Sequence, residues 1–385
     1  MTKPTESFDV AVVGGGAVGL GVAWRAAQRG LRVVVLERGE PGGGTSHLAA
    51  GMIAPVAEAV PIEQRLLRLN LASARMYPAF IEELAEASGR DPGYRQSGTL
   101  LVARDGDEAE ALERELAMRR RLELGVERLR ASEARRLEPG LAPTLRLALE
   151  VPDDHAVDPR KLTEALTSAV LRAGGAVRTH TEVTGLLRAG DHVTGVRVHD
   201  GTTVDADAVV IAAGAWSERI DDVPPEARVG VRPVKGQIMR LRDPAGPGLL
   251  TRVVRVQSWY LVPRGDGRYV LGATMEERGF DQTVTAGATF ELLREASELV
   301  PGISELVIDE LSAGLRPATV DNSPAIGPSA LPGLHYAVGH YRHGILLTPI
   351  TAEIVVGALA GSEPSSLANE FSPRRFGAAP AEVRG

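Results

Sequence analysis

The hydrophobic pattern at the start of the chain predicts a strand, a turn, a helix and a second strand. Val10–Val13 is a short apolar run that leads into a glycine-rich stretch, and helical spacing then continues to about Arg29. Gly30 follows, at a position where helix ends favour glycine. The next run, Leu31–Leu36, is apolar except at Arg32, which is typical of a parallel strand buried on both faces. This order of elements is that of a βαβ unit.

Helical and strand-like patterns alternate along the rest of the chain. Helical spacing predicts helices over residues 61–90, 107–123, 131–138, 159–172 and 289–299, with Ser132 and Asp158 as caps of the third and the fourth. Apolar runs predict strands over residues 94–103, 176–179, 182–187, 193–199, 203–206, 207–211, 237–241, 253–256, 260–262, 268–271, 305–314 and 334–339. We expect the strands between 176 and 206 to form a small meander, after which the chain returns to its first sheet.

The interleaving of these patterns predicts an α/β fold with two domains. The first is a discontinuous Rossmann-type domain made of residues 1–90, 150–225 and 325–365. The second is a substrate-binding domain of residues 91–149 and 226–324, with a mainly antiparallel sheet and therefore α+β in character. Residues 366–385 form a tail rich in serine, proline and alanine, which we expect to be poorly ordered at its end.

The glycines of the first turn have the spacing of a dinucleotide-binding fingerprint. Gly14, Gly16 and Gly19 fit the pattern G-x-G-x-x-G between a strand and a helix, and Glu37 ends the second strand, where an acid can bind ribose hydroxyls. A structural βαβ unit without a ligand is the alternative. The chain has no second fingerprint for a nicotinamide cofactor, so the bound dinucleotide is expected to be the redox cofactor itself, FAD.

Composition narrows the function classes and the compartment. The 385 residues carry a net charge of −7, which argues against nucleic acid as the main partner. The absence of cysteine excludes disulfides, thiolate metal sites and a cysteine-tethered flavin, and we expect no metal. The apolar segment Val10–Gly21 is broken by glycines and lacks a basic flank, so it predicts neither a signal peptide nor a membrane span. We therefore expect a cytoplasmic protein that binds no membrane.

Several motifs together resemble one flavoenzyme family. They are VVGGGAVG at 12–19 with VVVLER at 33–38, TSHLAAGMIAP at 45–55, VVIAAGAWS at 209–217, WYLVPR at 259–264 with LGATME at 271–276, GLRP at 314–317 and GHYRHGILLTP at 339–349. The chain resembles the D-amino-acid-oxidase-like flavoenzymes and, among them, the glycine oxidases of the thiamine pathway. The first and third motifs occur in many FAD enzymes, whereas the later ones in this order are more specific.

The resemblance implies a set of cofactor contacts beside the fingerprint glycines. They are Ala17, Val18, Glu37, Arg38, Thr45, Ser46, Ala50, Gly51, Met52, Val183, His340, Tyr341, Arg342, His343, Gly344, Ile345 and Leu346. Gly214, in the glycine turn after the strand 207–211, joins this cofactor site. A helix expected from Ile345 onward, directly after Gly344, would point its N-terminus at the flavin pyrimidine edge and favour reduction.

The resemblance also implies substrate and catalytic residues. Arg316 would clamp the substrate carboxylate, because a guanidinium offers a planar two-donor fork. Tyr260 would donate its hydroxyl to the same carboxylate, and Arg342 would lie close to substrate and flavin. The alternatives are a surface ion pair for Arg316 and ordinary core packing for Tyr260. His47 is either a flavin tether or a plain loop histidine, and we expect FAD to be bound non-covalently.

The activity implied by the resemblance is oxidative deamination of a small amino acid. Glycine, sarcosine or a small D-amino acid would lose a hydride from Cα to the flavin, and the resulting imine would hydrolyse to the oxo acid and ammonia. Oxygen would reoxidise the flavin and yield hydrogen peroxide. The oxo acid from glycine would be glyoxylate, and the reaction would serve thiazole formation for thiamine. A dehydrogenase that passes electrons to a quinone or carrier is the alternative, and a tRNA-modifying FAD protein is disfavoured by the acidic charge. The resemblance favours a homotetramer.

Overall fold

The predicted βαβ unit opens the fold. The computed structural model describes residues 7–377. Its first elements are β1 (Ser7–Val13), α1 (Ala17–Gln28) and β2 (Val33–Leu36). Gly30 follows α1 with a φ of 81°, a conformation that costs glycine little, so the predicted helix end is confirmed.

The first sheet has eight strands and is mostly parallel at its centre. Its order is β10-β11-β12-β1-β2-β9, and β19 pairs with both β12 and β18. The further strands are β9 (Ala176–Arg178), β10 (Val183–Ala189), β11 (His192–Val198), β12 (Thr203–Ile211), β18 (Ala325–Pro328) and β19 (Leu334–Val338). Since β12 runs parallel to β1, the chain does return to its first sheet.

Two strand predictions in this region are wrong in detail. The runs 203–206 and 207–211 form one strand, β12, because its first half pairs antiparallel with β11 and its second half parallel with β19. Burial alternates in the first half and becomes continuous in the second, so the pattern changes although the strand does not end. The strand predicted at 176–179 is β9, which pairs with β2 rather than with the meander.

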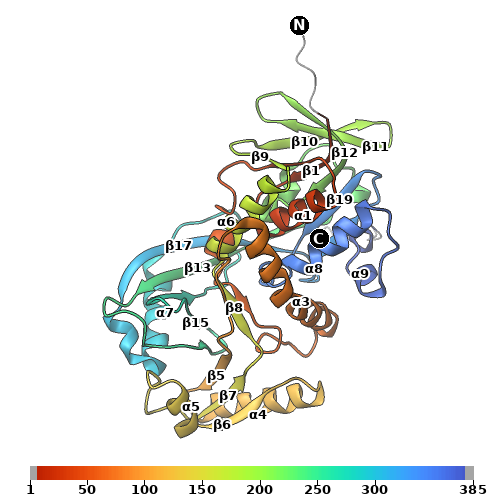
Figure 1. The fold of residues 1–385 in the computed structure, drawn as a ribbon. Coiled ribbons are helices and arrows are strands. Elements are labelled where there is room, and N and C mark those ends of the chain that lie inside the picture. Colours follow the sequence, from red (N-terminus) through yellow and green to blue (C-terminus); the bar gives the residue numbers. More distant parts are fainter. Residues whose placement is uncertain (1–6, 378–385) are drawn as a thin grey trace.

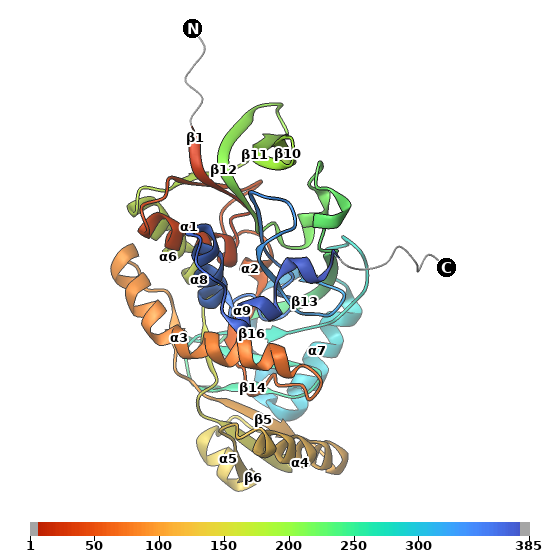
Figure 2. The same cartoon turned by 90° about the vertical axis from the view of Figure 1, so that its right-hand side faces the viewer.

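Four helices cover one face of this sheet. They are α1, α3 (Gln64–Ser88), α6 (Pro159–Arg172) and α8 (Thr348–Leu359), which pack on one another as Figure 2 shows. Trp24 of α1 meets Phe80 of α3 edge to face, with ring centroids 5.3 Å apart. Asp158 caps α6 as predicted, because its carboxylate accepts the Arg160 N–H. No helix within residues 7–377 is long and apolar enough to cross a membrane.

The second sheet also has eight strands and lies at the other end of the molecule, with α4 (Gly106–Arg121), α5 (Ala131–Leu137) and α7 (Ala286–Leu299) around it (Figure 1). Its order is β17-β13-β16-β15-β14-β5-β7-β6, antiparallel except between β14 and β5. The strands are β5 (Thr99–Ala103), β6 (Glu127–Arg130), β7 (Leu147–Val151), β13 (Arg232–Arg242), β14 (Val253–Arg255), β15 (Tyr260–Pro263), β16 (Arg268–Gly272) and β17 (Val307–Ala318).

A small three-stranded sheet joins the two large ones. It consists of β3 (Met52–Ile53), β8 (His155–Val157) and β4 (Tyr94–Arg95). The strand predicted at 94–103 is therefore wrong as one element, since Gly98, with a φ of 69°, separates β4 from β5. The cap predicted at Ser132 is also wrong. Helix α5 begins at Ala131, so its capping residue is Arg130, two residues before Ser132, and the Glu133 carboxylate accepts the Arg130 N–H.

The strands of the first sheet come from residues before 90, between 176 and 211 and after 325, and those of the second from the segments between. The predicted domain bounds themselves stay a prediction. Part of the expected tail packs on the fold, because α9 (Ser366–Glu370) leads to Phe371, which is buried and accepts the Ile326 N–H through its carbonyl. The end of the tail, 378–385, lies outside the described residues.

A buried histidine in the first sheet predicts a pH dependence of stability. Burial lowers the pKa of His335 on β19 to about 4, below its ordinary value of 6.5. The folded state therefore resists protonation, so His335 contributes full stability above pH 6.5 and loses it as the pH falls toward 4. This contribution is absent in His335→Leu. Between pH 7 and pH 5, its free energy of unfolding should therefore fall by about 2 kcal/mol less than that of the wild type. Urea unfolding at both pH values measures this, and equal losses in the two proteins would contradict it.

Candidate active site

The carboxyl ends of three central strands form the floor of a large cavity. Val13 of β1 pairs with both Leu36 and Ile211, so β1, β2 and β12 end at one level. In parallel sheets, ligands bind outside these ends. The cavity has a volume of about 1410 Å³ and extends from the fingerprint glycines to the second sheet. This exceeds the roughly 300–1,000 Å³ of ordinary ligand pockets, so there is room for a dinucleotide and a second molecule.

The fingerprint glycines form a turn that side chains would block. Gly14 has a φ of 110°, and a Cβ there would lie 2.5 Å from the Ala212 carbonyl oxygen. A Cβ on Gly19 would lie 2.0 Å from the Gly14 oxygen. The turn can therefore bring α1 close to the strand ends only because these residues are glycines, which fits the cradle of a dinucleotide pyrophosphate.

Glu37 and Arg38 lie at one end of the cavity. The Glu37 carboxylate accepts the N–H groups of Gly15 at 2.7 Å and of Gly39 at 2.9 Å. Each oxygen keeps a lone pair, so the carboxylate can still accept hydrogen bonds from ribose hydroxyls. The Arg38 guanidinium stacks over Trp216, 3.8 Å from the ring centroid. Trp216 lines the cavity too and was not predicted as a site residue, although it closely follows the glycine turn at Gly214.

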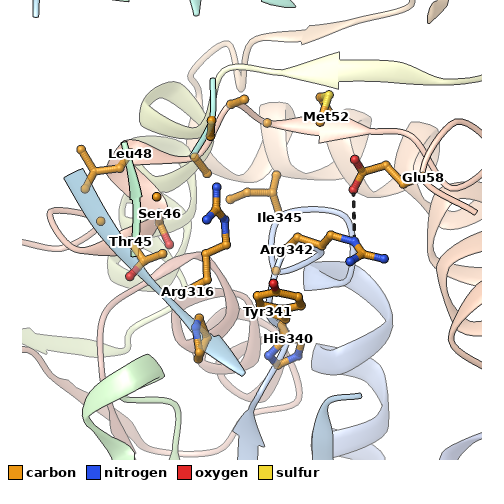
Figure 3. Close-up of a pocket in the computed structure, with 18 of the residues that line it drawn as sticks. Thr45, Ser46, Leu48, Met52, Glu58, Arg316, His340, Tyr341, Arg342 and Ile345 are labelled. Atoms are coloured by element: carbon orange, nitrogen blue, oxygen red, sulfur yellow. Dashed lines mark ion pairs between the residues drawn. The ribbon is translucent and has the colours of Figure 1, made fainter. Parts of the chain in front are cut away.

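The short helix α2 (Thr45–Leu48) links the glycine turn to the second sheet. The Ser46 hydroxyl accepts the Ala17 N–H at 3.0 Å. The Thr45 hydroxyl donates to the Leu315 carbonyl at 2.7 Å. The cofactor motif is thereby tied to β17 directly before Arg316. Figure 3 shows Thr45, Ser46 and Arg316 around the same pocket.

Arg316 and Tyr260 lie together in the part of the cavity formed by the second sheet. Arg316 donates to the Thr274 carbonyl at 3.1 Å and is close enough to the Tyr260 hydroxyl to affect its pKa. Burial raises the pKa of Tyr260, and Arg316 opposes this, so the phenol stays protonated and can donate. Among residues 7–377, no carboxylate lies within ion-pair distance of Arg316, so the surface ion pair considered above is not formed.

Two glycines clear the space for these side chains. A Cβ on Gly236 would lie 2.3 Å from an Arg316 nitrogen, and a Cβ on Gly272 would lie 2.7 Å from the Tyr260 oxygen. Gly272 on β16 pairs directly with Tyr260 on β15. Gly236 lies on β13, two residues after Val234, which pairs with Arg316 on β17. Sheet register therefore decides that the two side chains face the cavity.

A buried ionic cluster borders the same region. Glu58 faces Arg255 at 3.2 Å and Arg342 at 3.8 Å (Figure 3), and Arg342 also pairs with Glu63 at 2.7 Å. Burial opposes ionisation of Glu58, but the surrounding cations, first Arg255, outweigh it and lower the pKa of this carboxyl. Burial lowers the pKa of the neighbouring His343 to about 4, so its ring is neutral.

Glu58 and Arg255 were not predicted from the sequence. Both line the cavity. Glu58 follows shortly after the motif at 45–55, and Arg255 lies directly opposite Tyr260 across β14 and β15. Only the sheet pairing brings them together, and no local pattern indicates it.

Most of the predicted site residues line the cavity. They are Gly14, Gly16, Ala17, Val18, Gly19, Glu37, Arg38, Thr45, Ser46, Ala50, Gly51, Met52, Val183, Gly214, Tyr260, Arg316, His340, Tyr341, Arg342, Gly344 and Ile345. His343 and Leu346 do not line it and are buried. The His47 side chain does not line it either.

The helix predicted from Ile345 begins later. Residues 344–347 form a turn, and α8 starts at Thr348 with Pro349 in its first turn. Hydroxyls of Ser73 and Tyr77 on α3 donate to the carbonyls of Leu346 and Ile345 and hold this turn. The N–H groups of Ile345 and Leu346 have no acceptor among the described residues, which fits the binding of a polar cofactor edge there.

Comparisons with known proteins agree with this geometry. The family model described as DAO, FAD dependent oxidoreductase, matches residues 9–358. The glycine oxidase of Geobacillus kaustophilus is 37% identical over 378 residues, which cover 96% of this chain and 98% of that protein. A bifunctional protein ThiO/ThiG of Synechocystis is 35% identical over 96% of this chain but only 54% of its own length.

Solved structures are similar over nearly the whole chain. The crystal structure of the Geobacillus kaustophilus glycine oxidase superposes with a TM-score of 0.89 at 36% identity, covering 96% of this chain and 98% of that one. The crystal structure of iminodiacetate oxidase from Chelativorans sp. BNC1 superposes with a TM-score of 0.86 at 30% identity, covering 94% and 98%.

Proposed function

Because the chain belongs to the DAO family of FAD-dependent oxidoreductases, we propose that it catalyses oxidative deamination of glycine and other small amino acids. The products are the oxo acid, which is glyoxylate for glycine, ammonia and hydrogen peroxide. FAD is the cofactor. The chain has the family's FAD-binding fold, with a second, mainly antiparallel sheet.

One observation carries the substrate assignment. Arg316 is a partly buried guanidinium with no carboxylate partner among the described residues, and it lies beside a protonated tyrosine in the cavity of the cofactor motif. A buried cation without a counterion favours an anionic ligand. The carboxylate of an amino acid supplies it, with Arg316 and Tyr260 as donors.

The roles of the residues follow from this arrangement. Bound FAD would accept a hydride from the substrate Cα and pass the electrons to oxygen. Arg316 and Tyr260 hold the carboxylate and orient Cα, while Arg342 places a positive charge beside the substrate. No described side chain is needed as a strong base, because positioning contributes much of the barrier reduction. A role in thiazole formation for thiamine is supported by the similarity to ThiO/ThiG.

Oxygen uptake with a panel of amines tests the proposal. We expect glycine, sarcosine and D-alanine to consume oxygen and to form peroxide in equal amounts. Reduction of the flavin by glycine without oxygen uptake would point to a dehydrogenase, which the similarity to glycine oxidases does not favour. Failure of every amino acid in the panel to reduce the flavin anaerobically would overturn the proposal.

We expect the FAD to be bound non-covalently. The chain has no cysteine, and the His47 side chain does not line the cavity. Acid precipitation of the yellow protein should therefore leave the flavin in the supernatant, where its absorbance is measured. Flavin that stays in the protein pellet would revive His47 as a tether.

We also propose a homotetramer, which the family resemblance supports, and a cytoplasmic location, which the segment Val10–Gly21 supports because it predicts neither a signal peptide nor a membrane span. Light scattering of the purified protein measures the assembly, and a mass other than four chains would contradict it.

A further inference from the structure

The cavity contains a second arginine whose donors are only partly used. Arg255 donates to the Ala57 carbonyl at 3.0 Å and pairs with Glu58 at 3.2 Å. A guanidinium has five N–H donors, so three of them have no acceptor among the described residues. Its side chain lines the cavity and is 21% exposed. If Arg255 served only as the counterion of Glu58, it would not need unused N–H donors in a side chain that lines the cavity.

Arg255 lies next to Tyr260, one of the two residues of the proposed carboxylate clamp. It pairs directly with Tyr260 across β14 and β15, so both side chains extend from the same face of the sheet. The charges of Arg316, Glu58 and Arg255 all act on the pKa of the Tyr260 hydroxyl. Arg255 therefore lines the same part of the cavity as the two residues proposed to hold the amino acid carboxylate.

The cations around this region share few carboxylates. Glu58 pairs with both Arg255 and Arg342, and Arg342 also pairs with Glu63, whereas no carboxylate among the described residues lies within ion-pair distance of Arg316. His343 adds no positive charge, because its ring is neutral. An amino acid with two carboxylates could place one at Arg316 and one at Arg255, whereas a simple zwitterion supplies only one.

We propose that Arg255 forms a second carboxylate subsite, which makes amino diacids with a carboxylate on the nitrogen substituent substrates of this enzyme. The proposal rests on the proposed function, since Arg316 must hold the first carboxylate. One neighbour in structure is an iminodiacetate oxidase, a protein named for such a diacid.

Matched pairs of ligands test this subsite. Iminodiacetate and sarcosine differ only in the second carboxylate, as do their unreactive carbon analogues glutarate and butyrate. In the wild-type holoenzyme, we expect iminodiacetate to be oxidised and glutarate to bind more tightly than butyrate by calorimetry. In Arg255→Gln, the ratio of kcat/KM for iminodiacetate over sarcosine should fall about 10- to 100-fold, because charge-assisted bonds are lost. The glutarate preference should fall with it.

Two further variants separate recognition from folding. Arg255→Lys keeps the charge and should retain most of the preference. Arg252 lies just before β14, pairs with Glu150 at 3.2 Å and does not line the cavity, so Arg252→Gln should leave both ratios unchanged.

The outcomes distinguish this proposal from the one on which it rests. Glycine oxidation without any preference for glutarate over butyrate would overturn the subsite and leave the proposed function intact. The subsite would also be overturned if the iminodiacetate and glutarate preferences fell as much in Arg252→Gln as in Arg255→Gln. A glutarate preference that depends on Arg255, without oxidation of any amine, would support the subsite and sink the proposed function.

Discussion

Arg316→Leu is expected to lose most of the enzyme's ability to use amino acids while FAD stays bound. The substitution removes charge-assisted bonds and leaves the substrate carboxylate unpaired, which costs about 2–5 kcal/mol. The apparent KM for glycine should rise steeply. Because the same guanidinium orients Cα, flavin reduction at saturating glycine should slow as well. Stopped-flow absorbance and oxygen uptake measure the two effects.

Amines without a carboxylate supply the control for this result. They need no clamp, so Arg316→Leu should leave their weak turnover nearly unchanged. Gly236→Ala is a second variant that keeps the arginine but places a Cβ against it, 2.3 Å from a guanidinium nitrogen. It should reproduce part of the KM increase, about tenfold, through displacement of Arg316. Equal losses for glycine and for a simple amine would make Arg316 a structural residue.

Glu37→Ala is expected to weaken FAD binding strongly. Glu37 lines the cavity and braces the glycine turn by accepting the N–H groups of Gly15 and Gly39. Its removal deletes both the brace and the acceptor for the ribose, which costs about 1.5–3 kcal/mol for a hydrogen bond to a charged group. Titration of the apoprotein with FAD measures the affinity.

Glu40→Ala is the matched control for Glu37. Glu40 is exposed, pairs with the exposed His180 at 3.0 Å and does not line the cavity. Its loss should leave FAD affinity unchanged. Unaltered FAD affinity in a folded Glu37→Ala protein would show that the ribose is bound elsewhere.

Local motifs could be predicted because their parts are close in sequence. The strand, glycine turn, helix and acid of residues 10–37 depend on neighbouring φ angles and on helix and strand periodicity. The predicted cap at Asp158 and the helix end at Gly30 are confirmed for the same reason. Arg316 and Tyr260 were predicted to share one site because the later motifs resemble those of the D-amino-acid-oxidase-like flavoenzymes. Their contacts could not be derived from the sequence.

Predictions that depended on distant contacts were less accurate. Strand β12 changes partners along its length, so its burial pattern was misread as two strands. The helix expected from Ile345 starts at Thr348, because side chains of α3 hold the preceding turn. For that reason Ile345 faces the cavity, whereas Leu346 and His343 are buried behind it.

The sequence by itself determined the dinucleotide turn and its acid, since each depends on the backbone freedom of a few adjacent residues. Only the tertiary structure decided which side chains meet in the part of the cavity formed by the second sheet. Arg316, Tyr260 and Arg255 come from three strands, and their meeting depends on the register of β17, β15 and β14 and on the absence of side chains at Gly236 and Gly272. Strand register is set by pairing between distant segments, and no local pattern along the chain encodes it.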